Sequence, residues 1–169
     1  MIKRLGVSLA KVLSPYIFGL PMVMTAMFMT LALITYDRTD PSFNRASSQE
    51  VHNMSGEIGA YIADPLLQSL GFACILPILF LAVVGVKILA KSRVSIISLR
   101  FAFLLITTLS FTTLLACIGG KSSFTSHGGF IGSFLRNEMI LKFDESIVFW
   151  SALGITLLGS IISLNLTAR

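Results

Sequence analysis

Four long runs of residues without a charged side chain dominate this sequence. They cover residues 12–36, 65–86, 101–120 and 146–168, so each run has between 20 and 25 residues. A helix of about 20 apolar residues crosses the hydrocarbon core of a membrane, which is about 30 Å thick. None of the four runs contains Lys, Arg, Asp, Glu or His. We therefore predict an all-α membrane protein with four transmembrane helices over these ranges, which together form one four-span domain over residues 12–168.

The composition supports this class. Hydrophobic residues make up 54% of the chain and charged residues 12%, against about 25% charged in a typical soluble domain. The first run follows a basic segment, as a signal peptide would, but it is too long for a signal peptide and no A-x-A cleavage site follows it. We therefore expect residues 1–11 to be a cytoplasmic N-terminus and the first span to be retained.

The distribution of charge predicts the orientation. Residues 1–11, the loop 87–100 and Arg169 hold eight Lys or Arg residues and no acid, whereas the loops 37–64 and 121–145 hold five basic and eight acidic residues. Cytoplasmic loops carry the excess of Lys and Arg. We expect both termini in the cytoplasm and both acidic loops outside, with short helical segments in these outer loops. The net charge of +5 then needs no nucleic-acid partner.

A glycine motif occurs twice, each time shortly before an apolar run. The first copy lies in residues 52–67 and the second in residues 127–135. Aligned on Gly56 and Gly129, with Gly59 matching Gly132, both copies read G-x-I-G-[AS]-aromatic-aliphatic. The chain can therefore be read as one unit used twice, in the order span, loop with glycine motif, span.

The sequence also makes local predictions about helix ends and bends. Asp64 before Pro65 is typical of a helix N-cap followed by the first helical residue. Pro77, inside the second run, is expected to bend that span. The third run is rich in Thr and Ser, which can bond to their own helix or to a neighbouring one. Trp150 lies near the outer end of the fourth run, where an interfacial anchor is expected.

No catalytic constellation is evident, so we do not expect this chain to be an enzyme. Gly120-Lys121-Ser122 resembles the end of a phosphate-binding loop, but Leu115 stands where that motif needs its first glycine. The two cysteines fall in apolar runs and are expected to be packing residues. His52 and His127 lie in the outer loops, where exposed side chains are favoured over a two-histidine metal site. We therefore expect no metal and no cofactor in this chain.

The order of the motifs resembles a known family. Asp40-Pro41-Ser42 follows the first span, and N-x-x-G-x-x-G-A-x-x-A-D follows from Asn53 to Asp64. The chain is similar, over about residues 12–168, to the N-terminal four-span membrane domain of the FtsK/SpoIIIE-type bacterial DNA translocases. The residues that carry this family motif are also the candidate interaction residues: Asp40, Pro41, Ser42, Asn53, Gly56, Gly59, Ala60, Asp64, Gly129 and Gly132.

The resemblance implies an anchor in the bacterial inner membrane at the division septum, acting in chromosome segregation. In that family the membrane domain contacts other division-site membrane proteins and helps to assemble a hexamer. A cytoplasmic motor uses ATP to move DNA, but the sequence ends at Arg169 without a linker, a Walker A motif or a DNA-reading winged helix. ATP, Mg²⁺ and DNA are therefore expected to engage only a motor domain that is absent from these residues.

Two other functions stay open from the sequence. The chain could be a small four-helix channel or transporter with a polar seam along the third span, although spans without ionisable residues disfavour ion coupling. It could also be an assembly factor for another membrane complex. The glycine loops themselves have two interpretations, which are close packing at the membrane surface and a platform that docks another membrane protein.

Overall fold

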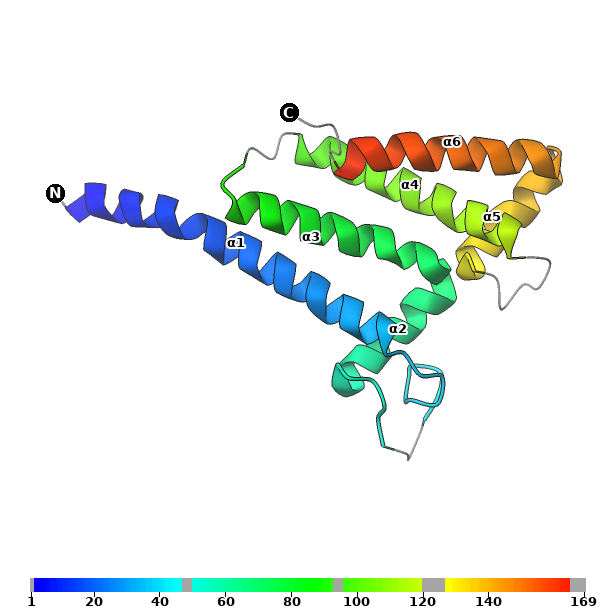
Figure 1. The fold of residues 1–169 in the computed structure, drawn as a ribbon, viewed down its shortest axis with the longest axis horizontal. Helices are drawn as coiled ribbons and strands as arrows, with labels where there is room; N and C mark the ends of the chain where they lie inside the picture. The colour runs from blue at the N-terminus through cyan, green and yellow to red at the C-terminus, as the bar shows by residue number, and fades with distance from the viewer. Residues whose placement is uncertain (1, 47–49, 93–95, 120–126, 165–169) are drawn as a thin grey trace.

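The computed structural model describes residues 2–46, 50–92, 96–119 and 127–164, with side chains from Ser14 onward. Figure 1 shows a helical protein. Its elements in chain order are α1 (Ile2–Ile34), α2 (Gly56–Leu70), the 3₁₀ helix η1 (Gly71–Cys74), α3 (Ile75–Leu89), α4 (Ile97–Ile118), α5 (Gly129–Ile140) and α6 (Glu145–Leu164). The all-α class is confirmed.

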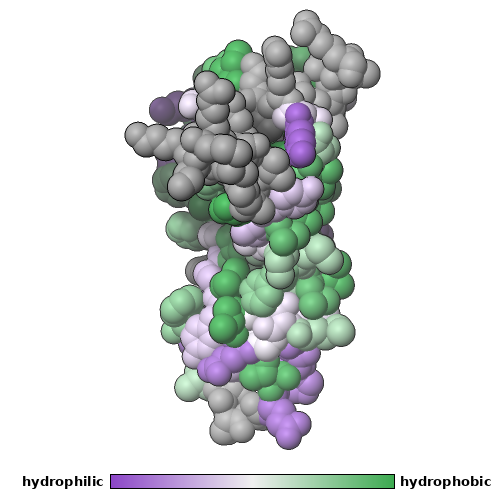
Figure 2. Space-filling model, turned by 90° about the vertical axis from the view of Figure 1, so that its left-hand side faces the viewer, coloured by the Kyte–Doolittle hydropathy of each residue, from purple (hydrophilic) through white to green (hydrophobic). Residues whose placement is uncertain are grey.

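Four helical segments among the described residues are long and apolar enough to cross a membrane. They are Ser14–Ile34, Gly56–Leu89, Ile97–Ile118 and Glu145–Leu164. Figure 2, which views the molecule from the end where α1 begins, shows hydrophobic side chains over much of the middle of the visible face. The four-span prediction is therefore confirmed, and the outward apolar side chains face the bilayer rather than water.

The spans pack as two hairpins, α1 with α3 and α4 with α6 (Figure 1). Glycines allow the close approach in both pairs. A Cβ atom placed on Gly19 would lie 2.9 Å from the carbonyl oxygen of Gly85, and a Cβ atom on Gly159 would overlap the hydroxyl of Thr107. Each hairpin therefore has a contact point at which a larger side chain would separate its helices.

A small apolar core joins the two hairpins. Leu76, Phe80 and Val84 on α3 pack with Leu104 on α4 and Leu164 on α6. All five side chains are buried. The core therefore lies between one helix of the first hairpin and both helices of the second.

The spans give the molecule two different ends (Figure 1). The start of α1, the end of α3, the start of α4 and the end of α6 lie at one end, and α2 and α5 lie at the other. We call this second end the glycine end, because Gly56, Gly71 and Gly129 are there. Lys87 and Lys91, at the last turn of α3 and just beyond it, belong to the opposite end. The basic loop after α3 and the glycine end therefore lie at opposite ends of the bundle, as the predicted orientation requires.

The hydroxyl groups of α4 are used within the bundle. Thr107, Thr108, Thr112 and Thr113 are buried and donate to carbonyl oxygens of their own helix at 2.6–2.9 Å. Ser110 instead donates to the carbonyl oxygen of Ala152 on α6 at 3.0 Å. Both predicted bonding modes are present, and this face packs against protein rather than lining an open polar seam.

The predicted helix start at Asp64 and Pro65 is wrong. Helix α2 begins at Gly56, so Asp64 and Pro65 lie in its interior. The Asp64 carboxylate does not cap the helix, because it accepts hydrogen bonds from the Tyr36 hydroxyl at 2.6 Å and the Gln68 amide at 2.7 Å. Tertiary contacts of the buried α2 face outweigh the local preference of proline for a helix start.

The predicted bend at Pro77 is also misplaced. Pro77 is the third residue of α3 (Ile75–Leu89), where a helix has no intrahelical partner for its N–H and proline is tolerated. The chain changes direction earlier, at η1, which begins with Gly71 at φ +59°. Figure 1 shows α2 set at an angle to α3 across this turn.

Candidate functional site

At the glycine end, Asp40 holds two distant parts of the first loop together. Its carboxylate, which is almost fully buried, accepts the backbone N–H of His52 at 2.7 Å and that of Asn53 at 2.9 Å. The His52 ring nitrogen Nδ1 lies 3.3 Å away. Asp40 therefore does not cap the residues directly after it, because its partners lie 12 and 13 residues further along the chain.

Asn53 connects this loop to the end of the first span. Its side-chain amide donates to the carbonyl oxygen of Ala32 at 2.8 Å, and its side-chain oxygen accepts the backbone N–H of Ser55 at 2.9 Å. Its own backbone carbonyl accepts the N–H of Gly56 at 2.8 Å. We call this set of bonds from Asp40 and Asn53 the Asp40–Asn53 latch.

Pro41 and Ser42 have supporting positions beside the latch. Pro41 is buried, and Ser42 forms a two-way backbone pair with Arg45, with N···O distances of 2.9 and 3.2 Å. This pair closes a tight turn directly after the first span. The D-P-S part of the motif therefore builds a rigid loop in this structure.

The two glycine motifs adopt the same local structure. Helices α2 and α5 begin at Gly56 and Gly129, which have φ of +72° and +66°. The buried faces also correspond, because Gly59, Ala60 and Ala63 on α2 align with Gly132, Ser133 and Arg136 on α5. The sequence repeat is therefore also a structural repeat.

The second glycine of each motif faces the preceding span. A Cβ atom on Gly59 would lie 2.7 Å from the side-chain oxygen of Asn53 and 3.3 Å from the Cβ atom of Ala32. A Cβ atom on Gly132 would overlap the carbonyl group of Thr112 on α4. At Gly132 the preceding span leaves no room for a side chain, and at Gly59 the loop residues Ser55 and Asn53 leave none.

The two halves meet through backbone atoms at the glycine end. The N–H of Phe72 donates to the carbonyl oxygen of His127 at 2.9 Å, and the two aromatic rings of these residues lie 5.7 Å apart. A Cβ atom on Gly129 would lie 2.5 Å from the nitrogen of Gly71. The sequence motif includes Gly129, but nothing in the linear pattern indicates its contact with Gly71.

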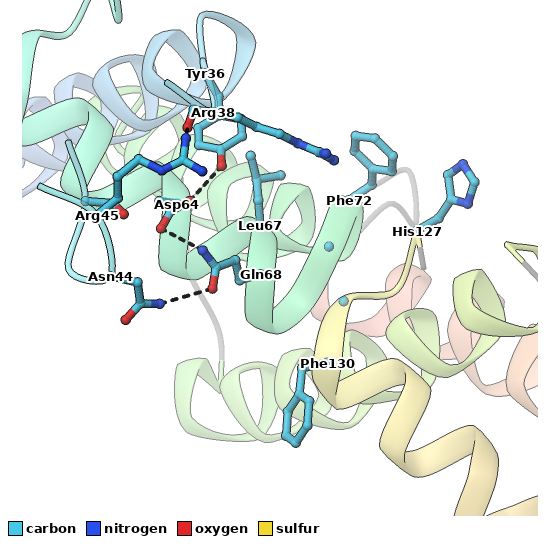
Figure 3. Close-up of a pocket in the computed structure, with 13 residues that line it drawn as sticks. Tyr36, Arg38, Asn44, Arg45, Asp64, Leu67, Gln68, Phe72, His127 and Phe130 are labelled. Carbon is cyan, nitrogen blue, oxygen red and sulfur yellow. Dashed lines mark hydrogen bonds between the residues drawn. The ribbon is translucent and has the colours of Figure 1, made fainter. Parts of the chain in front are cut away.

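A hydrogen-bonded chain runs from Tyr36, just after α1, across α2 (Figure 3). Tyr36 donates to Asp64, Gln68 donates to the other oxygen of Asp64, and Asn44 donates to Gln68 at 3.3 Å. Burial and the neighbouring Asp64 carboxylate raise the pKa of Tyr36 to about 12. The buried Asp64 of the family motif therefore connects the first loop to α2 through the Tyr36 phenol.

An open cleft of about 880 Å³ lies beside this chain of bonds. Figure 3 shows that its lining comes from the first loop, from α2 and η1, and from the start of α5. The lining combines two arginines, the polar chain and three aromatic rings: Tyr36, Arg38, Ser42, Asn44, Arg45, Asp64, Leu67, Gln68, Gly71, Phe72, His127, Gly129 and Phe130. The linear sequence gives no sign of this cleft, because its residues come from three separate segments.

An ion pair at the start of α6, between a buried arginine and an exposed glutamate, also has no signal in the linear sequence. Arg136 on α5 is almost fully buried and pairs with Glu145, the first residue of α6. The hydrogen bond from Arg136 to Glu145 is the main reason that the pKa of Arg136 is raised. This pair connects the second short helix to the last span, where the carboxylate also suits the helix N-terminus.

The described residues do not bring metal ligands together. Among them, no group of three or more His, Cys, Asp or Glu side chains could hold a metal ion. His52 lies against Asp40 and His127 against Phe72. The Gly120-Lys121-Ser122 segment lies outside the described residues.

Residues 13–168 match the family model described as the 4TM region of DNA translocase FtsK/SpoIIIE. No solved structure matches the chain significantly.

Individual relatives show the same similarity. A DNA translocase FtsK of Bradyrhizobium diazoefficiens is 26% identical over 154 residues, which are 89% of this chain and 19% of the relative. The DNA translocase FtsK of Caulobacter vibrioides is 41% identical over 64 residues, which are 38% of this chain and 8% of the relative. That of Pseudomonas putida is 46% identical over 55 residues, which are 31% of this chain and 7% of the relative. The chain therefore spans less than a fifth of the length of these relatives.

Proposed function

Because the chain belongs to the family of the 4TM region of DNA translocase FtsK/SpoIIIE, we propose that it anchors a cell-division DNA translocase in the membrane and contacts its partners there. The match of that family over residues 13–168 carries this proposal. The chain is the membrane region of the family and not its motor domain, so catalysis is not assigned to it.

The proposed location is the bacterial inner membrane, with both termini in the cytoplasm. Lys87, Lys91 and Arg100 lie at the end of the bundle opposite the glycine end. Loops rich in Lys and Arg stay in the cytoplasm. This charge pattern supports an outward-facing glycine end.

The proposed site of action is the division septum, in chromosome segregation, with other division-site membrane proteins as partners. A hexamer is the assembly that the family resemblance implies. The motif residues from Asp40 to Asp64 have packing roles in this structure, which makes the glycine end a rigid platform. We place the partner contacts on the exposed surface that these residues support.

ATP, Mg²⁺ and DNA belong, in this proposal, to a motor domain outside these residues. Leu115, at the position of the first glycine of a phosphate-binding loop, lies inside α4, so the required loop before a helix is not formed there.

A channel function receives no support from the geometry. The Thr-rich face of α4, which was the candidate polar seam, is buried against α5 and α6. Its hydroxyl groups bond to carbonyl groups of helices.

A fluorescent protein fused to the C-terminus tests location and orientation together. We expect fluorescence concentrated at midcell, because the fused protein is then in the cytoplasm and recruited with the division machinery. An alkaline phosphatase fusion at the same point should be inactive, and one inserted after Asn44 should be active. Uniform labelling of the membrane would contradict the septal role, and the reverse reporter pattern would contradict the orientation.

A further inference from the structure

Two arginines in the lining of the cleft at the glycine end have no carboxylate within ion-pair distance among the described residues. Arg38 and Arg45 line it and are exposed, and neither forms an ion pair within the part of the chain that the structure describes. Residues 47–49 of the same loop are Ser, Ser and Gln, which add no charge. The cleft therefore has two positive charges available to a ligand.

The one acidic side chain of the cleft lining is already occupied. Both carboxylate oxygens of Asp64 accept hydrogen bonds, one from Tyr36 and the other from Gln68. Asp64 is also buried, whereas both arginines are exposed. A ligand in the cleft would therefore meet the guanidinium groups before the carboxylate.

Two further features add positive character. Gly129, the first residue of the 12-residue helix α5, lines the cleft, and the first turn of α5 contains no acidic residue. The N-terminal end of a helix carries a partial positive charge. The guanidinium of Arg45 donates to the backbone carbonyl of Arg38, which holds the two arginines near each other.

Exposed apolar side chains lie in the cleft lining and just after it in the chain. Phe72 and Phe130 line the cleft and are each 61% exposed, and Ile75, the first residue of α3, is 50% exposed. In Figure 3 the side chain of Arg38 extends toward Phe72. The cleft lining therefore combines two arginines with two exposed phenylalanine rings, shortly before α3 begins at Ile75.

We propose that this cleft binds the phosphate headgroup of an anionic phospholipid. Guanidinium groups recognise phosphate oxygens with paired hydrogen bonds, and Phe72, Ile75 and Phe130 provide an apolar surface for the acyl chains. The volume of about 880 Å³ lies in the usual range of small-molecule sites, which is about 300–1,000 Å³. The exposed apolar side chains favour a membrane lipid over a soluble phosphate compound. This inference goes beyond the anchoring role and does not depend on septal location.

The test uses the full chain purified in mixed micelles that contain equal amounts of phosphatidylglycerol and phosphatidylcholine. Native mass spectrometry counts the lipids that each variant retains. We expect preferential retention of phosphatidylglycerol by the unmodified chain. Retention should fall about fivefold in R38Q and about 25-fold in R38Q/R45Q, because each arginine near a charged lipid contributes a similar factor.

A charge-matched control separates this site from general attraction. K91Q/K142Q removes two positive charges outside the cleft lining, so phosphatidylglycerol retention should stay at the level of the unmodified chain. Arg38 is exposed, and the helical circular dichroism of R38Q should therefore be unchanged. Equal losses in R38Q/R45Q and K91Q/K142Q would overturn the proposal.

The source of the phosphate is tested by competition. Soluble glycerol phosphate at millimolar concentration should not displace phosphatidylglycerol, because it lacks the acyl chains. Displacement by glycerol phosphate would overturn the assignment to a lipid. Binding of a glutamate-rich peptide that is lost in R38Q, without any phosphatidylglycerol preference, would instead assign the cleft to an acidic protein segment and overturn the proposal.

Discussion

Gly71 and Gly129 meet backbone to backbone. A Cβ atom on Gly129 would lie 2.5 Å from the nitrogen of Gly71, and a Cβ atom on Gly71 would lie 2.6 Å from the nitrogen of Gly129. Both residues have positive φ, +59° and +66°. The joint between the two halves of the bundle therefore has no room for a side chain from either half.

Replacing Gly129 by Ala should destabilise the protein strongly. The new methyl group would strike backbone atoms, which cannot move aside as a side chain can, and the left-handed backbone is unfavourable for alanine. We expect a loss of about 2 kcal/mol or more in the free energy of unfolding. Thermal unfolding in detergent, followed by the fluorescence of the single tryptophan, Trp150, measures the change.

Gly154→Ala is the matched control for this variant. No atom lies within 4 Å of a Cβ atom on Gly154, which is inside α6. Alanine there should leave stability unchanged or raise it by up to about 1 kcal/mol through helix propensity. Equal effects of the two substitutions would show that the Gly71–Gly129 contact is not special.

The second glycine of each motif should tolerate valine poorly. Gly132→Val would place a branched side chain against the carbonyl of Thr112, and Gly59→Val would place one against Asn53 and Ala32. We expect both variants to lower the yield of folded protein in the membrane and the unfolding temperature. Glu57→Ala, at an exposed position of α2, should have little effect. Three equal results would contradict a packing role for these glycines.

Removing the Asp40 carboxylate should release the first loop. Asp40→Ala leaves the backbone N–H groups of His52 and Asn53 without their acceptor, which we expect to cost about 2 kcal/mol. The loop should then be cleaved faster by trypsin after Arg45. Glu50→Gln, an exposed carboxylate of the same loop, is the control and should leave the cleavage rate unchanged. Unchanged cleavage in Asp40→Ala would exclude the Asp40–Asn53 latch.

The pKa of Tyr36, raised from 10.0 to about 12, predicts an alkaline loss of stability. Below pH 10 the phenol is protonated in both the folded and the unfolded chain, so the stabilisation that protonated Tyr36 gives the folded chain is fully present. Between pH 10 and about 12 the unfolded chain loses this proton first, and this stabilisation disappears as pH rises. In Y16F/Y61F, where Tyr36 is the remaining tyrosine, ultraviolet absorbance should record ionisation near pH 12. Ionisation near pH 10 would show that the bond to Asp64 does not form.

The local pattern of residues was enough to predict a large part of the fold. Uncharged runs long enough to cross a membrane predicted the four spans, and the spacing of Gly56, Gly59, Gly129 and Gly132 predicted the repeated unit. Local preference failed where tertiary contacts compete with it. Asp64 and Pro65 look like a helix start, but Asp64 is used by Tyr36 and Gln68 in the middle of a longer helix.

The candidate site was predictable only in part. Asp40 and Asn53 were singled out by their motif, yet their contact bridges 13 residues and no local rule indicates it. Arg38, Phe72 and His127 of the cleft have no shared pattern in the sequence. The interaction role of the motif residues stays a prediction, whereas their packing roles follow from the contacts described above.

The sequence by itself determined which segments lie in lipid and which lie in water. Transfer of a helix from water to lipid depends on its composition and length, and not on the helices that it packs against. The sequence also determined the repeated unit, since a glycine with positive φ is a local requirement. Only the tertiary structure decided which surfaces meet. The pairing of α1 with α3, the contact of Gly71 with Gly129 and the cleft between the halves depend on packing among residues far apart in the chain, where many similar apolar faces compete.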